Sequence, residues 1–341
     1  MKGLSNIRKI IRKTEFIVFL IILFLGIMVQ IRSGQFFTGN NLIDIIRAMI
    51  VPGMFAIGCQ MVIISGGIDV SFTAIALVAM YSTNLILLRG NYQGSILLPY
   101  IMAAGFGLIM GTINAVLISK FKFPTLIVTL GTASVFYGFV NGVLKANSLK
   151  LIDPLFDHGV STLFSSYNSQ LKLKSDMTVH VLILIVLILI AFFIMKYTII
   201  GRGIYAIGGD EISATRAGLN ISAIKFFIYC FAGMVAGITG LVQASMSQIV
   251  QPKAMVGMEL VVIGAVVIGG TNVTGGYGSI TGAILGVALL ITVSNSMILL
   301  GVSTFWNQVF TGAFIVVGTG ISAYQIKNSK KHLVSLNRGR E

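Results

Sequence analysis

The stretch VLILIVLILIAFFIM, which runs from Val181 to Met195, contains no polar side chain. A chain that crosses a bilayer must satisfy its own backbone hydrogen bonds, so it crosses as a helix or as a strand of a closed barrel. Barrel strands alternate apolar and polar residues, and this stretch does not alternate. It therefore predicts a membrane-spanning helix and indicates an all-α membrane protein.

The composition of the whole chain agrees with this fold class. The protein has 341 residues, of which 56% are hydrophobic and 10% are charged. Its mean hydropathy is +0.95, whereas soluble domains carry roughly 25% charged residues. The net charge of +14 is spread between apolar runs instead of forming a basic stripe interleaved with aromatic residues. We therefore predict no nucleic-acid partner.

Small side chains inside the apolar segments are interpreted as packing residues. Cys59 and Cys230 lie alone in such segments, which predicts buried free cysteines and not a disulfide or a metal site. The spacings Gly107–Gly111 and Gly233–Gly237 predict helices that approach each other closely.

Ten segments are long and apolar enough to span a bilayer, which requires about 20 apolar residues. The segments at 42–64 and 255–270 either cross fully or re-enter from one side. We predict a single membrane domain, residues 1–341, with an external loop at 145–177, a cytoplasmic segment at 200–222 and a cytoplasmic tail at 327–341. The predicted spans lie near 16–31, 42–64, 71–88, 96–118, 124–144, 178–199, 223–246, 255–270, 279–299 and 305–326.

The distribution of Lys and Arg predicts the orientation, because basic residues accumulate in cytoplasmic segments. Ten spans place both termini on one side, and with the N-terminus inside, most of the 24 basic residues are cytoplasmic. The basic and apolar N-terminus lacks a small-residue cleavage site, so it is interpreted as a first span that stays attached. We predict a multi-pass membrane protein with both termini in the cytoplasm.

Two similar segments interrupt the apolar helices: GGIDVS, Gly66 to Ser71, and GGTNVT, Gly269 to Thr274, at a constant offset of 203 residues. Gly-interrupted segments at corresponding positions of two halves indicate the binding site of a transporter. Glycines let the chain leave the helix, and the polar side chains add hydrogen-bonding groups for a polyhydroxylated solute. An alternative, which leaves the pathway role open, is that Asp69 or Ser71, and Asn272 or Thr274, cap the helix that follows.

Glu259 is the other acid within an apolar run. An ionisable residue at membrane depth is a functional candidate, although one near the end of a span can reach the interface instead. No metal or catalytic site is predicted. The predicted solute pathway comprises Gly66, Gly67, Asp69, Ser71, Glu259, Gly269, Gly270, Asn272 and Thr274.

The chain contains no Gly-Lys pair, and hence no phosphate-binding loop of the GxxxxGK[ST] type. Uphill transport therefore needs a separate ATPase or an ion gradient. The segment from Asp210 to Leu219 predicts a short helix, because acidic residues at its start suit the helix dipole and Gly218 suits its end. This helix is either a contact for an ATPase or a solvated surface helix.

Five pieces of the chain carry a resemblance to a known family. In order, they are GGIDVS, FPTLIVTLGTASVFYG, GRGIYAIGGDEISATRAGLN, QPKAMVGMELVVIGAVVIGGTNVTGGYGSITGAILG and LLGVSTFWNQV. They resemble the permease subunits of ribose-type sugar ABC importers, a family that includes ribose, xylose and galactoside permeases. The resemblance implies a ten-helix permease of the bacterial inner membrane that is not itself an enzyme. It also implies a dimer with a second permease copy or paralogue, an extracytoplasmic solute-binding protein, and a cytoplasmic ATPase that uses the ATP, so that this chain binds no cofactor.

The resemblance implies that the segment matching Gly209 to Gly218 is the coupling helix that docks on the ATPase. The chain departs from the family at Thr73 and Val261, where members commonly have Gly and Asp. Both departures lie near the predicted pathway, so the solute is predicted only as a sugar, expected to be a monosaccharide. The predicted coupling residues are Gly209, Asp210, Glu211, Ala214, Arg216, Ala217 and Gly218.

Other functions are compatible with the residues. An ABC permease for a nucleoside or a furanosyl signalling molecule would share the architecture. An ion-coupled secondary carrier would need acids at the membrane midplane, and only Asp69 and Glu259 are candidates. A membrane enzyme is disfavoured, because His158, His180 and His332 form no catalytic constellation in the sequence.

Overall fold

The computed structural model describes residues 14–145, 147–168 and 173–303, together with isolated positions between 305 and 320. The predicted tail at 327–341, and most of the predicted tenth span at 305–326, lie outside the described residues. Within the described part, eight helices are long and apolar enough to cross a membrane. The predicted class, an all-α multi-pass membrane protein, is therefore confirmed, and the total of ten spans stays a prediction.

The long helices coincide with predicted spans. Side chains of Thr38, Asn220 and Ser279 start three of them by accepting a hydrogen bond from a backbone N–H of the first turn. The long helices are α2 (Thr14–Ser33), α3 (Gly39–Ile64), α4 (Phe72–Arg89), α5 (Leu97–Ser119), α6 (Thr125–Gly138) with its π-helical extension η1 (Phe139–Val143), α8 (His180–Tyr197), α11 (Ile221–Ser247) and α13 (Ile280–Leu299).

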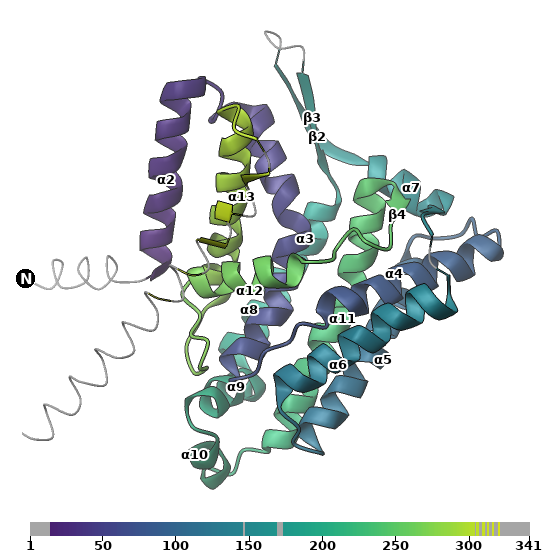
Figure 1. Ribbon diagram of the computed structural model, residues 1–341, viewed down its shortest axis with the longest axis vertical. Helices are drawn as coiled ribbons and strands as arrows, with labels where there is room; N and C mark the ends of the chain where they lie inside the picture. Colours follow the sequence, from purple (N-terminus) through teal and green to yellow (C-terminus); the bar gives the residue numbers. More distant parts are fainter. Residues whose placement is uncertain are drawn as a thin grey trace, which may run out of the picture.

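Most of the shorter elements gather at the two ends of the helix bundle, whereas α12 (Met258–Ile268) lies near its middle (Figure 1). Figure 1 shows α10 at the lower end and the hairpin of β2 and β3 at the upper end, and we name these the α10 end and the hairpin end. The short helices are α7 (Asp153–Val160), α9 (Ile199–Gly209), α10 (Glu211–Arg216) and α12 (Met258–Ile268). The antiparallel strand pairs are β1 (Leu149–Lys150) with β4 (Ile249–Val250) and β2 (Thr162–Asn168) with β3 (Leu173–Thr178).

The two predicted spans of uncertain extent differ in length. The segment predicted at 42–64 forms most of α3, which has 26 residues. The segment predicted at 255–270 contains α12, which has only 11 residues. At about 1.5 Å per residue, a helix of that length covers roughly half of a hydrocarbon core about 30 Å thick. α3 is long enough to cross, whereas α12 is a half-helix.

Helices α5 and α11 pack with their backbones in contact. A Cβ atom built on Gly111 would lie 2.5 Å from Tyr229 O, and one built on Gly233 would lie 2.5 Å from Gly107 O. Helix association in lipid depends on close van der Waals packing, because lipid tails are as apolar as the side chains they would replace. The packing role predicted for these glycines is confirmed.

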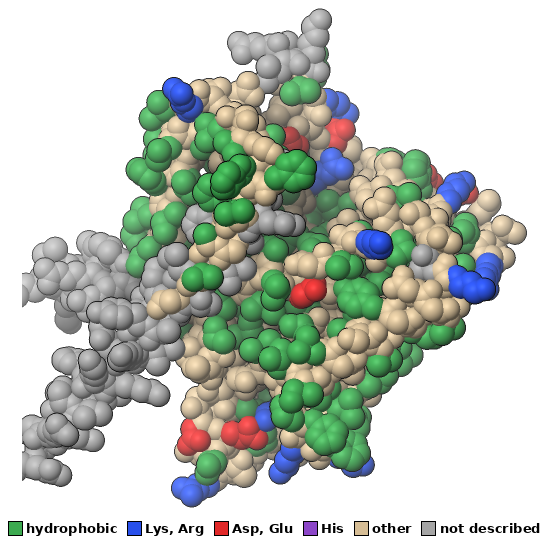
Figure 2. All heavy atoms as spheres, viewed as in Figure 1, with side chains coloured by type: hydrophobic (Ala, Val, Ile, Leu, Met, Phe, Trp, Pro, Cys, Tyr) green, Lys and Arg blue, Asp and Glu red, His purple; other side chains and the backbone are tan. Residues whose placement is uncertain are grey.

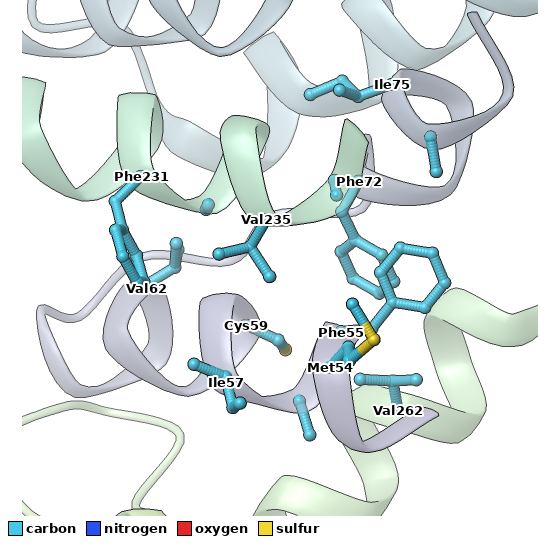
Figure 3. Close-up of a cluster of buried hydrophobic side chains, with 14 of the residues drawn as sticks. Met54, Phe55, Ile57, Cys59, Val62, Phe72, Ile75, Phe231, Val235 and Val262 are labelled. Carbon is cyan, nitrogen blue, oxygen red and sulfur yellow. The ribbon is translucent and has the colours of Figure 1, made fainter. Parts of the chain in front are cut away.

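The centre of the protein is a cluster of apolar side chains from α3, α4, α11 and α12, shown in Figure 3. The rings of Phe55 on α3 and Phe72 on α4 lie 5.0 Å apart between centroids, and Val262 of α12 is part of the same cluster. Cys59 and Cys230 are buried and free, as predicted. This cluster holds the start of α4 and the half-helix α12 against α3.

The surface agrees with a membrane location. Large hydrophobic side chains of the outer helices are exposed, including Phe24 and Ile31 of α2 and Phe193 of α8. Figure 2 shows hydrophobic side chains across much of the middle of this face, with an acidic side chain among them, and most other charged side chains toward the margins. An exposed apolar band of this kind is stable only in contact with lipid or with another apolar surface.

Candidate solute pathway and coupling segment

The first break ends α3 with a Schellman motif. Gly66 N–H donates to Ile63 O at 2.9 Å, and Gly67 N–H donates to Val62 O at 3.1 Å. The φ of Gly66 is +82°, a left-handed value that costs other residues about 1–2 kcal/mol and that glycine adopts freely. The first glycine of the pair is thus required locally to end the helix.

Asp69 and Ser71 form the turn that follows. Asp69 Oδ1 accepts hydrogen bonds from Ser71 N–H at 2.7 Å and from the Ser71 hydroxyl at 2.6 Å. Asn114 of α5 donates to Ser71 Oγ at 2.8 Å. Asp69 is 3% exposed and Ser71 is 0% exposed. The Ser71 side chain makes no cap hydrogen bond to α4, so the capping alternative is wrong here: Asp69 shapes the turn before the helix instead.

The second break ends α12 with the same motif. Gly270 N–H donates to Val267 O at 2.9 Å, and Thr271 N–H donates to Val266 O at 3.2 Å. The φ of Gly270 is +97°. Its neighbour Gly269 packs directly against the backbone of α13. The second glycine of this pair, and not the first, therefore takes the left-handed conformation.

Asn272 and Thr274 form a turn that matches the one at Asp69. Asn272 Oδ1 accepts from Thr274 N–H at 3.2 Å and from the Thr274 hydroxyl at 3.0 Å, and Asn272 Nδ2 donates to Gly275 O at 3.0 Å. Thr274 is exposed. The following helix, α13, is capped by Ser279. The capping alternative is therefore wrong at this break too.

The structure brings part of each break together around one cavity of about 220 Å³. Gly66 and Gly67 of the first break and Thr274 of the second line it. Asp69, Ser71 and Glu259, by contrast, do not line this cavity. The remaining lining residues are Ser65, Thr125, Ile207, Gly208, Glu211, Lys225 and Tyr229.

Glu259 lies in the first turn of α12 and joins three helices. Its Oε2 accepts hydrogen bonds from Gly257 N–H at 3.1 Å and from the Thr73 hydroxyl of α4 at 3.1 Å. Thr73 Oγ1 also lies 3.0 Å from the Tyr137 hydroxyl of α6. Sequence reasoning noted Thr73 only as a departure from the family, and nothing local to Tyr137 indicated that it would meet an acid far along the chain.

The predicted coupling segment contains a shorter helix than expected. The prediction placed it at Asp210 to Leu219, and α10 runs from Glu211 to Arg216. Asp210 precedes the helix and accepts hydrogen bonds from the N–H groups of Ile212 and Ser213. The helix stops early because Gly218, with a φ of +82°, starts a Schellman closure.

The side chains of this segment are mostly exposed. Gly209, Arg216, Ala217 and Gly218 face solvent, and Ala214 is 4% exposed. Hydrogen bonds from Ser213 lower the pKa of Asp210 below its ordinary value, because they stabilise the charged carboxylate. A solvated helix and a docking helix would both have these properties, so the coupling role stays a prediction.

Two histidines that are far apart in the sequence meet near the hairpin end. His158 Nδ1 of α7 lies 3.1 Å from His180 Nε2 of α8, and His180 Nε2 lies 3.0 Å from the Ser245 hydroxyl of α11. Ser245 donates to Leu155 O at 2.8 Å, so the set ties α7 to the long helices. Among the described residues, no group of three or more His, Cys, Asp or Glu side chains could hold a metal ion.

Comparison with known proteins assigns the chain to a transport family. The model of the family described as "Branched-chain amino acid transport system / permease component" matches residues 41–318. The chain is 31% identical to the ribose import permease protein RbsC of Bacillus subtilis over 88% of this chain and 89% of that protein. It is 26% identical to the L-arabinose ABC transporter permease protein AraH of Azospirillum brasilense, over 94% and 90%, and 26% identical to the fructose import permease protein FrcC of Rhizobium meliloti, over 86% and 81%. No solved structure matches the chain.

Proposed function

We propose, on the premise that the chain belongs to the family of branched-chain amino acid transport system permease components, that it is the membrane subunit of an ABC importer for a sugar. The resemblance to ribose-type importers is confirmed by the relatives, which are import permeases for ribose, arabinose and fructose. A permease subunit is not an enzyme. ATP hydrolysis belongs to a separate subunit, and this chain needs no cofactor of its own.

The observation that carries the sugar assignment is the charge state of the cavity between the two breaks. Its two charged side chains, Glu211 and Lys225, pair with each other at 2.7 Å. An amino acid carries an ammonium and a carboxylate, and each needs an opposite charge or several hydrogen bonds when it leaves water. A sugar is neutral and can be satisfied by hydroxyl and backbone groups such as those of Gly66, Thr125 and Thr274.

The nine predicted pathway residues stay part of this proposal, with unequal support. Gly66, Gly67 and Thr274 have the most direct support, because they line the cavity. Asp69 and Ser71 are buried in this conformation, so their contact with a solute would require movement of the turn. Gly269, Gly270 and Asn272 are supported only by their place in the second break.

Glu259 is the most suitable acid for a hydroxyl-bearing solute. Together with Thr73 and Tyr137 it forms a set of one carboxylate and two hydroxyl groups where α4, α6 and α12 meet. Thr73 is buried in this conformation, so its contact with a solute would also require movement. A carboxylate accepts hydrogen bonds from several hydroxyls, and a hydroxyl both donates and accepts. We therefore add Thr73 and Tyr137 to the proposed pathway. Because family members commonly have Gly at the position of Thr73, this residue is a candidate for setting which sugar is carried.

The α10 end is the proposed docking site of the ATPase. The Ile212 side chain is 65% exposed on α10, and this helix stands at the lower tip of the molecule in Figure 1. The exposed side chains of α10 leave this helix accessible to a partner protein. The proposal places this end and both termini in the cytoplasm of a bacterial cell, and the hairpin end toward the solute-binding protein. A second permease copy or a paralogue completes the complex.

Reconstitution tests the function directly. The permease would be incorporated into liposomes with its co-purified ATPase and solute-binding protein, and uptake of labelled ribose, arabinose, fructose, a nucleoside and leucine would be measured with and without ATP. We expect ATP-dependent uptake of at least one of the sugars and none of leucine. Uptake of leucine alone would overturn the sugar assignment, and uptake of the nucleoside alone would favour the nucleoside alternative. Uptake that survives without the ATPase and stops with an ionophore would indicate a secondary carrier.

A further inference from the structure

Gly208, near the end of α9, packs between the last residue of α3, before the first break, and the loop after the second. A Cβ atom built on Gly208 would overlap both Ile64 O and Gly276 N. One built on Gly275 would lie 2.9 Å from Gly66 N. Backbone therefore meets backbone at this point, and no side chain larger than hydrogen fits at Gly208. We call the set Gly66, Gly208, Gly275 and Gly276 the glycine junction.

Two hydrogen bonds hold the junction together. Gly276 N–H donates to Ile64 O, the carbonyl of the last residue of α3, at 2.8 Å. The Tyr205 hydroxyl on α9 donates to Gly278 O, in the loop after the second break, at 2.9 Å. The second bond is independent of the glycine packing and joins α9 to the same loop. The junction thus links α3, α9 and the loop before α13.

The connection between the junction and α10 is short. Asp210 is the only residue between the end of α9 and the start of α10, and the Glu211–Lys225 ion pair ties α10 to α11 at 2.7 Å. Side chains can change rotamer to absorb a small displacement, whereas contacts between backbones cannot. We therefore expect a displacement of α10 to move Gly208 and the backbone that it contacts at Ile64 and Gly276.

We infer that Gly208 is a positioning residue of the transport step. Through the glycine junction, it transmits movement of α10 to the residues that flank the two breaks. Gly66, Gly208 and Thr274 line the cavity, so a movement of the junction would change the shape of the cavity. This inference rests on the proposed function, because it assumes that an ATPase moves α10. It adds the residues by which that movement reaches the pathway.

The test measures coupling in the reconstituted complex as the amount of solute transported per ATP hydrolysed. Gly208→Ala inserts a methyl group into the junction, and Tyr205→Phe removes one hydrogen bond without adding bulk. We expect Gly208→Ala to lower transport per ATP by about tenfold, in the range of typical coupling energies. We expect Tyr205→Phe to lower it by about fivefold, as for the loss of one hydrogen bond. A purely structural defect would reduce the amount of complex and leave this ratio unchanged.

The matched control is Gly131→Ala. Gly131 is also a helical glycine, but a Cβ atom built on it meets nothing within 4 Å, so its transport per ATP should equal that of the wild type. If Gly208→Ala does not assemble, Tyr205→Phe decides the matter by itself. Wild-type coupling in Tyr205→Phe, or in an assembled Gly208→Ala complex, overturns the inference.

A second readout does not require knowing the solute. A cysteine at Thr274, which is exposed, would be labelled with an aqueous thiol reagent in the complete complex, with and without ATP. The inference predicts that ATP changes the labelling rate and that Tyr205→Phe removes most of this change. If ATP still changes the labelling rate in Tyr205→Phe, the inference about the junction is contradicted, and the proposed function is not. If neither ATP-driven uptake nor an ATP effect on labelling occurs in the wild-type complex, the proposed function fails, and the inference fails with it.

Discussion

The two Gly-Gly breaks use the same local devices in different surroundings. Each ends its helix with a glycine in the left-handed conformation, at Gly66 and at Gly270, and each continues with a side-chain oxygen that accepts two hydrogen bonds from the residue two positions later, at Asp69 and at Asn272. The first turn is buried and held by Asn114, whereas the second is exposed at Thr274. Sequence similarity thus reproduces a turn without reproducing its environment.

The spacing of the devices differs by one residue. From the left-handed glycine to the acceptor there are three positions in the first break and two in the second, so the alignment of GGIDVS with GGTNVT matches the turns but shifts the helix ends. The first break leads directly into α4. The second break instead leads into a loop that ends at the Ser279 cap of α13.

The largest difference should appear when each acceptor is removed. Asp69→Ala leaves a buried N–H and a buried hydroxyl of Ser71 without their acceptor, which should cost about 3 kcal/mol of stability. Asn272→Ala should cost about 0.5 kcal/mol, because water can replace the lost oxygen at a partly exposed site. Thermal unfolding of the purified protein in detergent measures both. Equal losses would mean that burial does not distinguish the two turns.

Asp69→Asn is the matched control for the first break, since it keeps the acceptor oxygen and the size of the side chain. This variant should be nearly as stable as the wild type, while its uptake falls by an amount that differs among sugars. Uptake should fall further in Asp69→Ala. Wild-type uptake of every transported solute by Asp69→Asn would remove Asp69 from the pathway.

Cysteines introduced into the two breaks should differ in labelling rate by at least about tenfold, because the buried site must open before it reacts. Thr274→Cys should react readily with a small aqueous thiol reagent, whereas Ser71→Cys, at a 0% exposed position, should be protected without the partners. The wild-type protein is the background control, because both native cysteines are buried. Equal rates in the resting protein would contradict the burial of the first turn.

Replacing the left-handed glycines should give a smaller difference in stability between the two breaks. Here the second break should lose more stability than the first. Gly66→Ala meets only the conformational penalty, about 1–2 kcal/mol, since its nearest neighbouring atom would be 3.8 Å away. Gly270→Ala should cost about 1 kcal/mol more, because its Cβ atom would lie 2.8 Å from Thr14 Cβ. Unfolding in detergent again measures the difference. The additional Thr14→Gly change should bring the cost of Gly270→Ala down to that of Gly66→Ala; a lack of rescue would show that the contact with α2 is not the cause.

Asp210 is a third side chain that accepts backbone hydrogen bonds, here as the exposed N-cap of α10, and its effect should be the smallest. Its pKa is lower in the folded protein than the ordinary value of about 4, so the stabilisation is complete above that value and is lost as the pH falls through the lower folded pKa. Hydrogen exchange at Ser213 N–H should therefore become less protected in acid. Asp210→Asn should show no such pH dependence, and a parallel loss in both proteins would point to a different titrating group.

Much of the helical architecture could be predicted because the bilayer restricts the choices. Runs such as Val181 to Met195 have no alternative to a spanning helix, and the described long helices coincide with predicted spans. The bounds of α10 and the length of α12 were less accessible. α10 ends early because Gly218 turns left-handed, and α12 is short because Gly257, also left-handed, starts it late.

The candidate site could be predicted only in part. The two breaks and Glu259 stand out as polar or glycine-rich positions in apolar surroundings, and the sequence alone shows that contrast. Thr73 and Tyr137 do not stand out, yet both bond within the set that includes Glu259. The pairing of His158 with His180 is of the same kind.

The sequence by itself determined which segments are helical and where they break, because backbone hydrogen bonding in lipid and the left-handed φ of glycine are local requirements. Only the tertiary structure decided that one turn is buried and the other exposed, and that Gly208 lies between Ile64 and Gly276. Burial and contact between distant segments depend on how whole helices pack. A short motif therefore repeats its hydrogen bonds wherever it occurs, while its neighbours are set by the rest of the chain.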